Sequence, residues 1–214
     1  MIRKQNVLTP LLSVLFLLSG LSMTAREKEK VSLFENGAEA KHSFMSVSTN
    51  ALYDAAFVPN LGLEFNIYDN WTLAINGMGA WWTFEKKHIY WRVYGGDVTI
   101  KKYFGKKSEY RSLTGHHLGV YGQALSYDLE AGHFGRMSPN LTVGGGIEYG
   151  YSFPVSNALN IDLSVGIGYL GGQFYEYVEN EGHYVWRATV QQRWFGPTKA
   201  GVSLVWLIDS KKGR

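Results

Sequence analysis

The sequence predicts an all-β fold, an eight-stranded antiparallel up-and-down transmembrane β-barrel. Three observations lead to this prediction. The N-terminus has the order of an export signal, eight long segments alternate apolar and polar residues, and the polar side of these segments is rich in glycine. A membrane barrel presents one side of each strand to lipid and the other to its interior, so alternation is the expected pattern.

The first 25 residues predict a secretory signal peptide. Arg3 and Lys4 precede an apolar run over residues 8–21, and small residues follow up to Ala25. The run is shorter than the ~20 residues that a helix needs to cross a bilayer. We therefore expect export with cleavage rather than a membrane anchor.

Export divides the rest of the chain into three parts. Residues 26–42 are polar and mixed in charge, which predicts a short periplasmic N-terminal segment. The outer-membrane β-barrel is expected over 43–209, and a polar C-terminal tail over 210–214. No second apolar run of helical length follows the signal, so the exported protein is either a barrel or soluble.

The composition narrows the class of protein. Charged residues make up 18% of the chain, below the ~25% usual in soluble domains, while aromatic residues reach 15%. A net charge of +3 is too small to indicate nucleic-acid binding. The absence of cysteine excludes disulfides, thiolate metal sites and a lipoprotein anchor. The same composition would also suit a soluble β-sandwich.

Residues 59–68 show the alternation most clearly. One side is apolar and the other is polar or very small: Leu61, Leu63, Phe65 and Ile67 stand against Asn60, Gly62, Glu64 and Asn66. In a soluble sandwich the apolar side would form the core instead. The glycine-rich polar side favours the barrel, because glycine weakens a water-facing strand but gives clearance inside a narrow ring.

Two strands are harder to place. The first, near residues 43–53, alternates weakly. The segment 89–104 is ambiguous in its first half, and its second half fits best with Val98 and Ile100 outward and Thr99 inward.

The isolated charges on the polar side predict a network inside the barrel. Charges removed from water must be paired and hydrogen-bonded. Eight strands also leave no open channel of useful width. We therefore interpret the network as a plug of the interior rather than an ion path. Its predicted members are Asn60, Glu64, Asn66, Asp97, Lys101, Glu148, Asp162 and Lys199.

Aromatic residues gather near the ends of the predicted strands. Tryptophan and tyrosine prefer the two membrane interfaces, where they form girdles around a barrel. The predicted girdle residues are Trp71, Trp81, Trp82, Tyr149, Tyr151 and Trp206.

The connections give a further test. With both chain ends in the periplasm, residues 69–70 and 154–158 are short periplasmic turns, and 128–138 and 176–196 are long outer loops. Two connections fit less well, because 54–58 is a short outer loop and 105–113 a long periplasmic turn. The expected partners are outer-membrane lipid and an extracellular ligand or protein at the aromatic loop 176–196, with no nucleic acid.

Three sequence blocks carry a family resemblance. They are the Asn-x-Leu-Tyr-Asp block at 50–54, the Pro-Asn-Leu-Gly-x-Glu block at 59–64 and the Phe-Gly-Pro-Thr-Lys block at 195–199. The chain resembles the Bacteroidetes outer-membrane family called domain of unknown function 3575 (DUF3575). The resemblance covers nearly all of the predicted mature chain and departs most over 94–114. It implies a small outer-membrane barrel and brings no activity.

The sequence predicts no catalytic residues, cofactor or metal site. His116, His117 and His133 with Ser126 invite comparison with lipid hydrolases of barrel form. Period two puts His116 and Ser126 on the same lipid-facing side, but about 33 Å apart along one strand. Two alternatives remain beside the non-enzymatic barrel. One is a lipid-modifying enzyme acting through His133 and Ser126, and the other a soluble periplasmic barrel that binds a small apolar ligand.

Overall fold

The computed structural model describes residues 43–84, 89–106, 108, 111–180 and 183–209. The predicted signal peptide, N-terminal segment and C-terminal tail lie outside this part of the chain. The described elements are β1 (Ser43–Asn50), α3 (Ala51–Ala55), β2 (Asn60–Tyr68), β3 (Trp71–Phe84), β4 (Ile89–Phe104), β5 (Gly115–Ala131), β6 (Phe134–Met137), β7 (Thr142–Pro154), β8 (Leu159–Asn180) and β9 (His183–Asp209).

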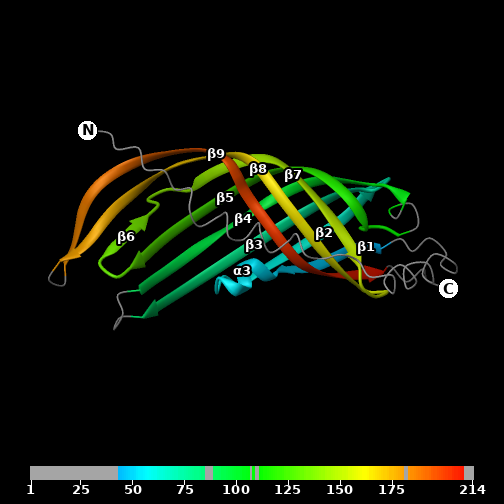
Figure 1. Ribbon diagram of the computed structural model, residues 1–214, viewed down its shortest axis with the longest axis horizontal. Helices are drawn as coiled ribbons and strands as arrows, with labels where there is room; N and C mark the ends of the chain where they lie inside the picture. The colour runs from blue at the N-terminus through cyan, green and yellow to red at the C-terminus, as the bar shows by residue number, and fades with distance from the viewer. Residues whose placement is uncertain (1–42, 85–88, 107, 109–110, 181–182, 210–214) are drawn as a thin grey trace, which may run out of the picture. The chain divides into compact units, whose positions relative to one another are not determined.

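The strands form one antiparallel sheet that closes into a ring (Figure 1). Each long strand pairs with the next along the chain, and β9 returns to pair with β1. The all-β, antiparallel prediction is confirmed. The expected count of eight is wrong for the described residues, because the sheet has nine strands. The additional strand, β6, is only four residues long and lies between β5 and β8.

One end of the ring, which we call the turn end, carries the connections at 69–70 and 154–158. Both are short, as expected. Asp69 and Asn70 have φ values of 43° and 63°. Positive φ at both central residues is the geometry of a type I′ hairpin turn, which these residue types tolerate.

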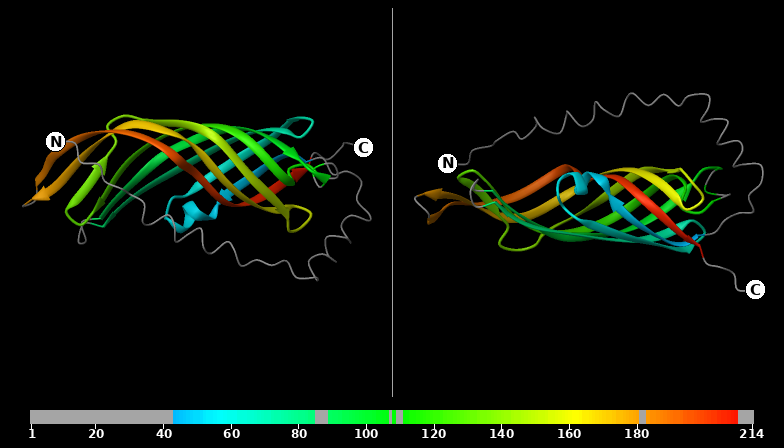
Figure 2. Two further views of the ribbon diagram at one scale, coloured as in Figure 1. Left: turned by 45° about the horizontal axis from the view of Figure 1, so that its top comes forward. Right: turned by 90° about the horizontal axis from the view of Figure 1, so that it is seen from below.

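The opposite end, which we call the extended end, differs from the prediction. Residues 128–138 are largely strand, because β5 continues to Ala131 and β6 follows after a two-residue turn. Residues 176–180 and 183–196 belong to the paired strands of the β8–β9 hairpin rather than to a loop. Figure 2 shows this hairpin reaching beyond its neighbours. The prediction failed because both faces of these segments mix aromatic and charged side chains, which hides the alternation.

The first connection also differs. β1 ends at Asn50, three residues earlier than expected, and residues 51–55 form the single-turn helix α3. The Asn50 side chain accepts a hydrogen bond from Leu52 N, as an N-cap residue does. The segment 89–104 is one continuous strand, and Val98 and Ile100 are exposed while Thr99 is fully buried. This confirms the predicted faces of its second half.

Polarity is inverted relative to a water-soluble fold. Among the described residues, the buried side chains are more often polar or charged than hydrophobic. The outward side of the strands exposes large apolar side chains, among them Val120 at 65% and Ile147 at 59%. The remaining hydrophobic core is a small cluster of Tyr103, Leu113, Val205 and Leu207. The candidate functional site is therefore sought among the polar side chains inside the ring.

Candidate functional site

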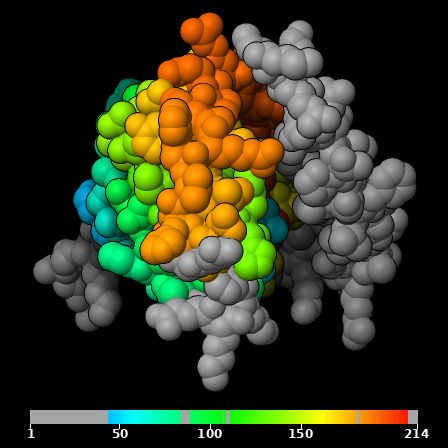
Figure 3. Space-filling view, turned by 90° about the vertical axis from the view of Figure 1, so that its left-hand side faces the viewer, coloured from blue at the N-terminus to red at the C-terminus, as the bar shows by residue number. Residues whose placement is uncertain are grey.

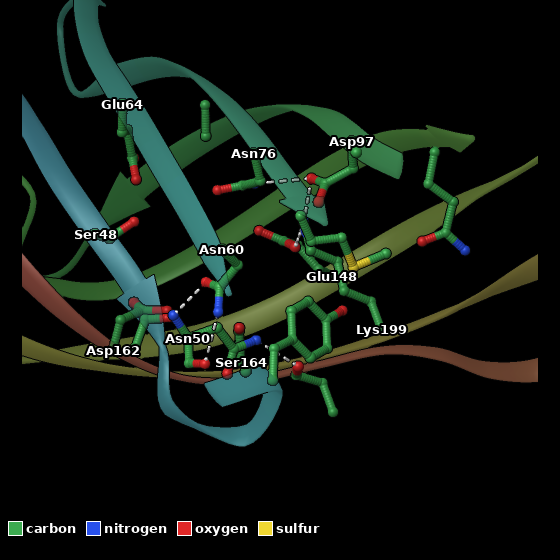
Figure 4. Close-up of a pocket in the computed structure, with 18 of the residues that line it drawn as sticks. Ser48, Asn50, Asn60, Glu64, Asn76, Asp97, Glu148, Asp162, Ser164 and Lys199 are labelled. Carbon is green, nitrogen blue, oxygen red and sulfur yellow. Dashed lines mark hydrogen bonds and ion pairs between the residues drawn. The ribbon is translucent and has the colours of Figure 1, made fainter. Parts of the chain in front are cut away.

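The centre of the ring holds two lysines, Lys101 and Lys199, that share the carboxylate of Glu148. Figure 4 shows Lys199 and Glu148 there. Lys101 Nζ lies 3.2 Å from Glu64 Oε2 and 3.6 Å from Glu148 Oε1. Lys199 Nζ lies 2.9 Å from Glu148 Oε2 and 2.6 Å from Asp97 Oδ1. Glu148 is 1% exposed. Buried charges are tolerated in this way because each has an opposite charge within ion-pairing distance.

A histidine joins the network from the side. His117 is fully buried, and its Nε2 lies 2.8 Å from Asp162 Oδ2. Gly150 leaves the room for the ring, because a Cβ at that position would overlap the imidazole and come within 2.6 Å of Leu163 O. The sequence analysis considered His117 only with the other histidines and did not include it in the network.

The helix α3 is fastened at the edge of this interior by two asparagines. Asn60 Nδ2 donates to Asn50 O and to Asp54 Oδ1, and Asn60 Oδ1 accepts from Asn50 N. The Asn50 amide in turn donates to Ala200 O and accepts from Val202 N of β9. The Asn60 side chain thus bonds to the backbone of Asn50 at the end of β1, and the Asn50 side chain bonds to the backbone of β9.

A cavity of about 70 Å³ lies between α3 and the charged network. Its lining includes Tyr53 of α3, Asn76, Asp97, Glu148 and Lys199. A volume of this size holds several waters. The side chains labelled in Figure 4 converge on it from β1, β2, β3, β4, β7, β8 and β9.

The remaining predicted polar residue, Asn66, lies nearer the turn end, where its Nδ2 donates to Ser112 Oγ at 3.4 Å. The predicted girdle residues lie on strands near either end of the ring. Trp81 is 70% exposed, while Trp82 lies on the opposite face of β3 and donates from Nε1 to Phe57 O. The two tryptophans cannot belong to one outward girdle, because consecutive strand residues point to opposite faces.

A second polar cluster lies on the outward side of the extended end. Tyr177 OH donates to Asp128 Oδ1 at 2.8 Å, and Asp128 Oδ2 lies 3.5 Å from Arg92. Burial raises the pKa of the Tyr177 phenol, and the hydrogen bond to Asp128 raises it further. Figure 3 looks onto this end, where the β8–β9 hairpin crosses the view.

The histidines and serine considered for catalysis have separate partners. Ser126 is on the outward side as expected, but it is buried, and its Oγ accepts from Ser138 Oγ. His133 Nδ1 lies 3.5 Å from Glu179 Oε2, and His116 Nδ1 lies 2.7 Å from Tyr149 OH. Residue 138 follows β6, the strand that the sequence did not predict, which is why the burial of Ser126 was missed.

Two features are absent from the described residues. These residues contain no group of three or more histidine and acidic side chains arranged to hold a metal ion. They also include no helix with the length and hydropathy of a membrane span.

The fold and the site together define an all-β protein whose closed ring of strands encloses a network of buried ion pairs. The model of the family described as "Protein of unknown function (DUF3575)" matches residues 16–208. The chain therefore belongs to the DUF3575 family. Comparisons with curated proteins and with solved structures found no match.

The three sequence blocks behind the resemblance meet in one place. Asn50 and Asp54 of the first block bond to Asn60 of the second. Lys199 of the third bonds to Asp97 and Glu148, and Thr198 bonds to Tyr121 across the interior. The family blocks therefore contain residues of the interior network and the residues whose hydrogen bonds hold α3 in place.

Proposed function

We propose that this protein is a non-enzymatic β-barrel of a Gram-negative outer membrane, exported by its N-terminal signal and closed to bulk flow by its interior network. The observation that carries the proposal is the inverted polarity. Buried ion pairs fill the inside of the ring, while its outside exposes residues such as Leu118, Val120 and Ile147. Exposed apolar surface on this scale is unfavourable in water and is expected where lipid is the solvent.

The ring also satisfies the main backbone requirement of a bilayer. Lipid offers no hydrogen-bonding partners, so only helices and closed barrels span it. Around the turn end, every long strand has a neighbour on both sides, from β1 through to β9. In this placement the turn end lies in the periplasm and the extended end outside the cell.

The extended end is the proposed recognition surface. Near the tip of the β8–β9 hairpin, Tyr184 is 67% and Trp186 65% exposed. Exposed aromatic side chains are common anchors of binding sites. We propose that an extracellular ligand or protein binds there.

Fractionation tests the membrane placement. The mature protein is expected in the outer-membrane fraction and to need detergent, and its folded form should migrate differently on a gel before and after heating. A mature protein that stays monodisperse in plain buffer would contradict the proposal and favour the soluble barrel.

Cysteine labelling tests the orientation, because the native chain has no cysteine. Gln191→Cys on β9 is expected to react with a membrane-impermeant maleimide on intact cells. Asn157→Cys at the turn end should react only after the outer membrane is opened. Labelling of Asn157→Cys on intact cells would reverse the proposed orientation.

A further inference from the structure

The last strand, β9, is paired on both sides over only part of its length. It pairs with β8 from His183 to Trp206, but with β1 only from Ser203 to Asp209. Among the described residues, no strand pairs with this second side of β9 over 183–199. We call this stretch the free edge of β9.

The free edge presents a row of backbone hydrogen-bonding groups. Just beyond the end of β1, the Asn50 side chain bonds to Ala200 O and Val202 N of β9. Alternate residues of an antiparallel strand turn both their N–H and their C=O to the same side. The row therefore continues past residue 200, where the described chain supplies no strand to pair with it. Such a row can accept another extended chain as an additional strand.

The free edge lies beyond the apolar outer surface of the ring. Phe195 is 76% exposed and stands opposite Tyr169, which is also on the outward side. Toward the tip of the hairpin, the next outward residues of β9 are Arg193, Gln191 and Thr189, and all three are exposed. Polar outward side chains indicate that water surrounds this part of the strand. Its partner is therefore expected from the aqueous side.

The charges on the free edge select among the possible partners. Arg187 and Arg193 are exposed, and neither has an acidic partner among the described residues. No residue from 183 to 208 is acidic. Opposite charges stabilise paired strands, whereas like charges facing each other destabilise them. A second copy of β9 would bring arginines toward arginines, so the free edge favours an acidic strand.

We propose that the free edge of β9 binds an extended, acidic segment of a partner protein, which joins the sheet as a further strand. The inference rests on the proposed recognition role of the extended end and names the kind of partner that this end takes. Backbone hydrogen bonds supply the affinity in this mode of binding, and the side chains beside them supply the specificity. The exposed Tyr184 and Trp186 on the same strand are available for such side-chain contacts.

The test uses the full mature protein, folded in detergent, and a synthetic peptide as the added strand. The peptide alternates valine and threonine and carries a glutamate near each end, spaced to meet Arg187 and Arg193. Hydrogen–deuterium exchange of the protein is measured with and without the peptide. We expect the peptide to slow exchange over 184–195 and to leave exchange elsewhere in the ring unchanged.

Two controls separate strand pairing from simple attraction between charges. The same peptide with an N-methylated backbone keeps its glutamates but cannot donate backbone hydrogen bonds, and it should give no protection. Arg187→Glu combined with Arg193→Glu is expected to weaken binding of the acidic peptide about tenfold. The double variant should instead bind a peptide with lysine in place of glutamate. Heat-dependent gel migration checks that the variant is folded.

The outcomes distinguish this inference from the proposed function. Absence of protection by the acidic peptide would overturn strand addition, and so would equal protection by the N-methylated peptide. Protection of 184–195 without any peptide would show that a second copy or another part of the chain already covers the free edge, and would also overturn the inference. The assay in detergent does not depend on the membrane placement or the orientation, because fractionation and cysteine labelling test those separately.

Discussion

Glu148 is the residue on which the interior network depends most. It neutralises both Lys101 and Lys199 and is almost completely removed from solvent. A water-exposed ion pair, by contrast, contributes little, because solvent screens it. The pair of Asp69 and Lys102 at the turn end is of this second kind.

Glu148→Gln is therefore expected to destabilise the folded protein by about 3–5 kcal/mol, since it leaves two buried lysines short of a counter-charge. Asp69→Asn is the control and should cost no more than ~1 kcal/mol. Urea titration followed by tryptophan fluorescence in detergent measures both. Equal midpoints for the two variants would show that the network does not stabilise the fold.

Two glycines of the strands, one on the inner face and one on the outer face, give a second prediction. Gly150 has the His117 ring and Leu163 O where a side chain would stand, whereas an added Cβ at Gly122 would meet nothing within 4 Å. Gly150→Ala should cost about 1–3 kcal/mol through overpacking. Gly122→Ala should be neutral or slightly stabilising. The folded fraction after refolding into detergent tests the pair, and equal loss in both would contradict the packing argument.

Individual residues of the site were predictable, but their pairing was not. Period two placed Glu64, Asp97 and Glu148 on the inner side of the strands. Which lysine meets which carboxylate depends on the register between strands and on distances across the ring, and one sequence carries neither. Lys199, for example, reaches Asp97 from a strand that is not its neighbour.

At the scale of elements, the connection between β1 and β2 is the most specific feature. Asn60 makes hydrogen bonds that hold residues 50, 54 and 58 together. The sequence did not predict α3, because five residues are too few for helical periodicity to show. The N-cap asparagine before it was the available signal.

Asn60→Ala is expected to release this connection while the ring persists, because it removes several hydrogen bonds worth ~1 kcal/mol each. Hydrogen–deuterium exchange should accelerate over residues 51–59 and stay unchanged over β7 and β8. Asn140→Ala, at an exposed position, is the control. Unchanged exchange at 51–59 would show that other contacts hold α3.

Strands close to the turn end were predicted well, and those of the extended end were not. Where one face meets apolar surroundings and the other a polar interior, alternation is strict, as in β2. In β8, every residue from Gly171 to Glu179 is half-buried, whichever face it lies on. Burial therefore shows no two-residue period in this part of the strand.

For the whole molecule, the apolar outer surface makes the strongest prediction. Val120→Arg places a charge in the middle of the proposed membrane band, which costs ~2–4 kcal/mol at the bilayer midplane. Thr189→Arg, on the extended end, should cost little. The heat-modifiable fraction recovered from the outer membrane measures both. Normal assembly of Val120→Arg would contradict the membrane placement and favour the soluble alternative.

The closing pair of the ring has a consequence for how the chain matures. Residues 43–50 of β1 pair with residues 203–209 of β9, so the first strand can pair on this side only after the last strand has been made. The β8–β9 hairpin, with its neighbours adjacent in sequence, needs no such wait. Residues 203–209 must therefore be synthesised before the ring of strands can close. A chain truncated before residue 203 would lack the partner strand of β1.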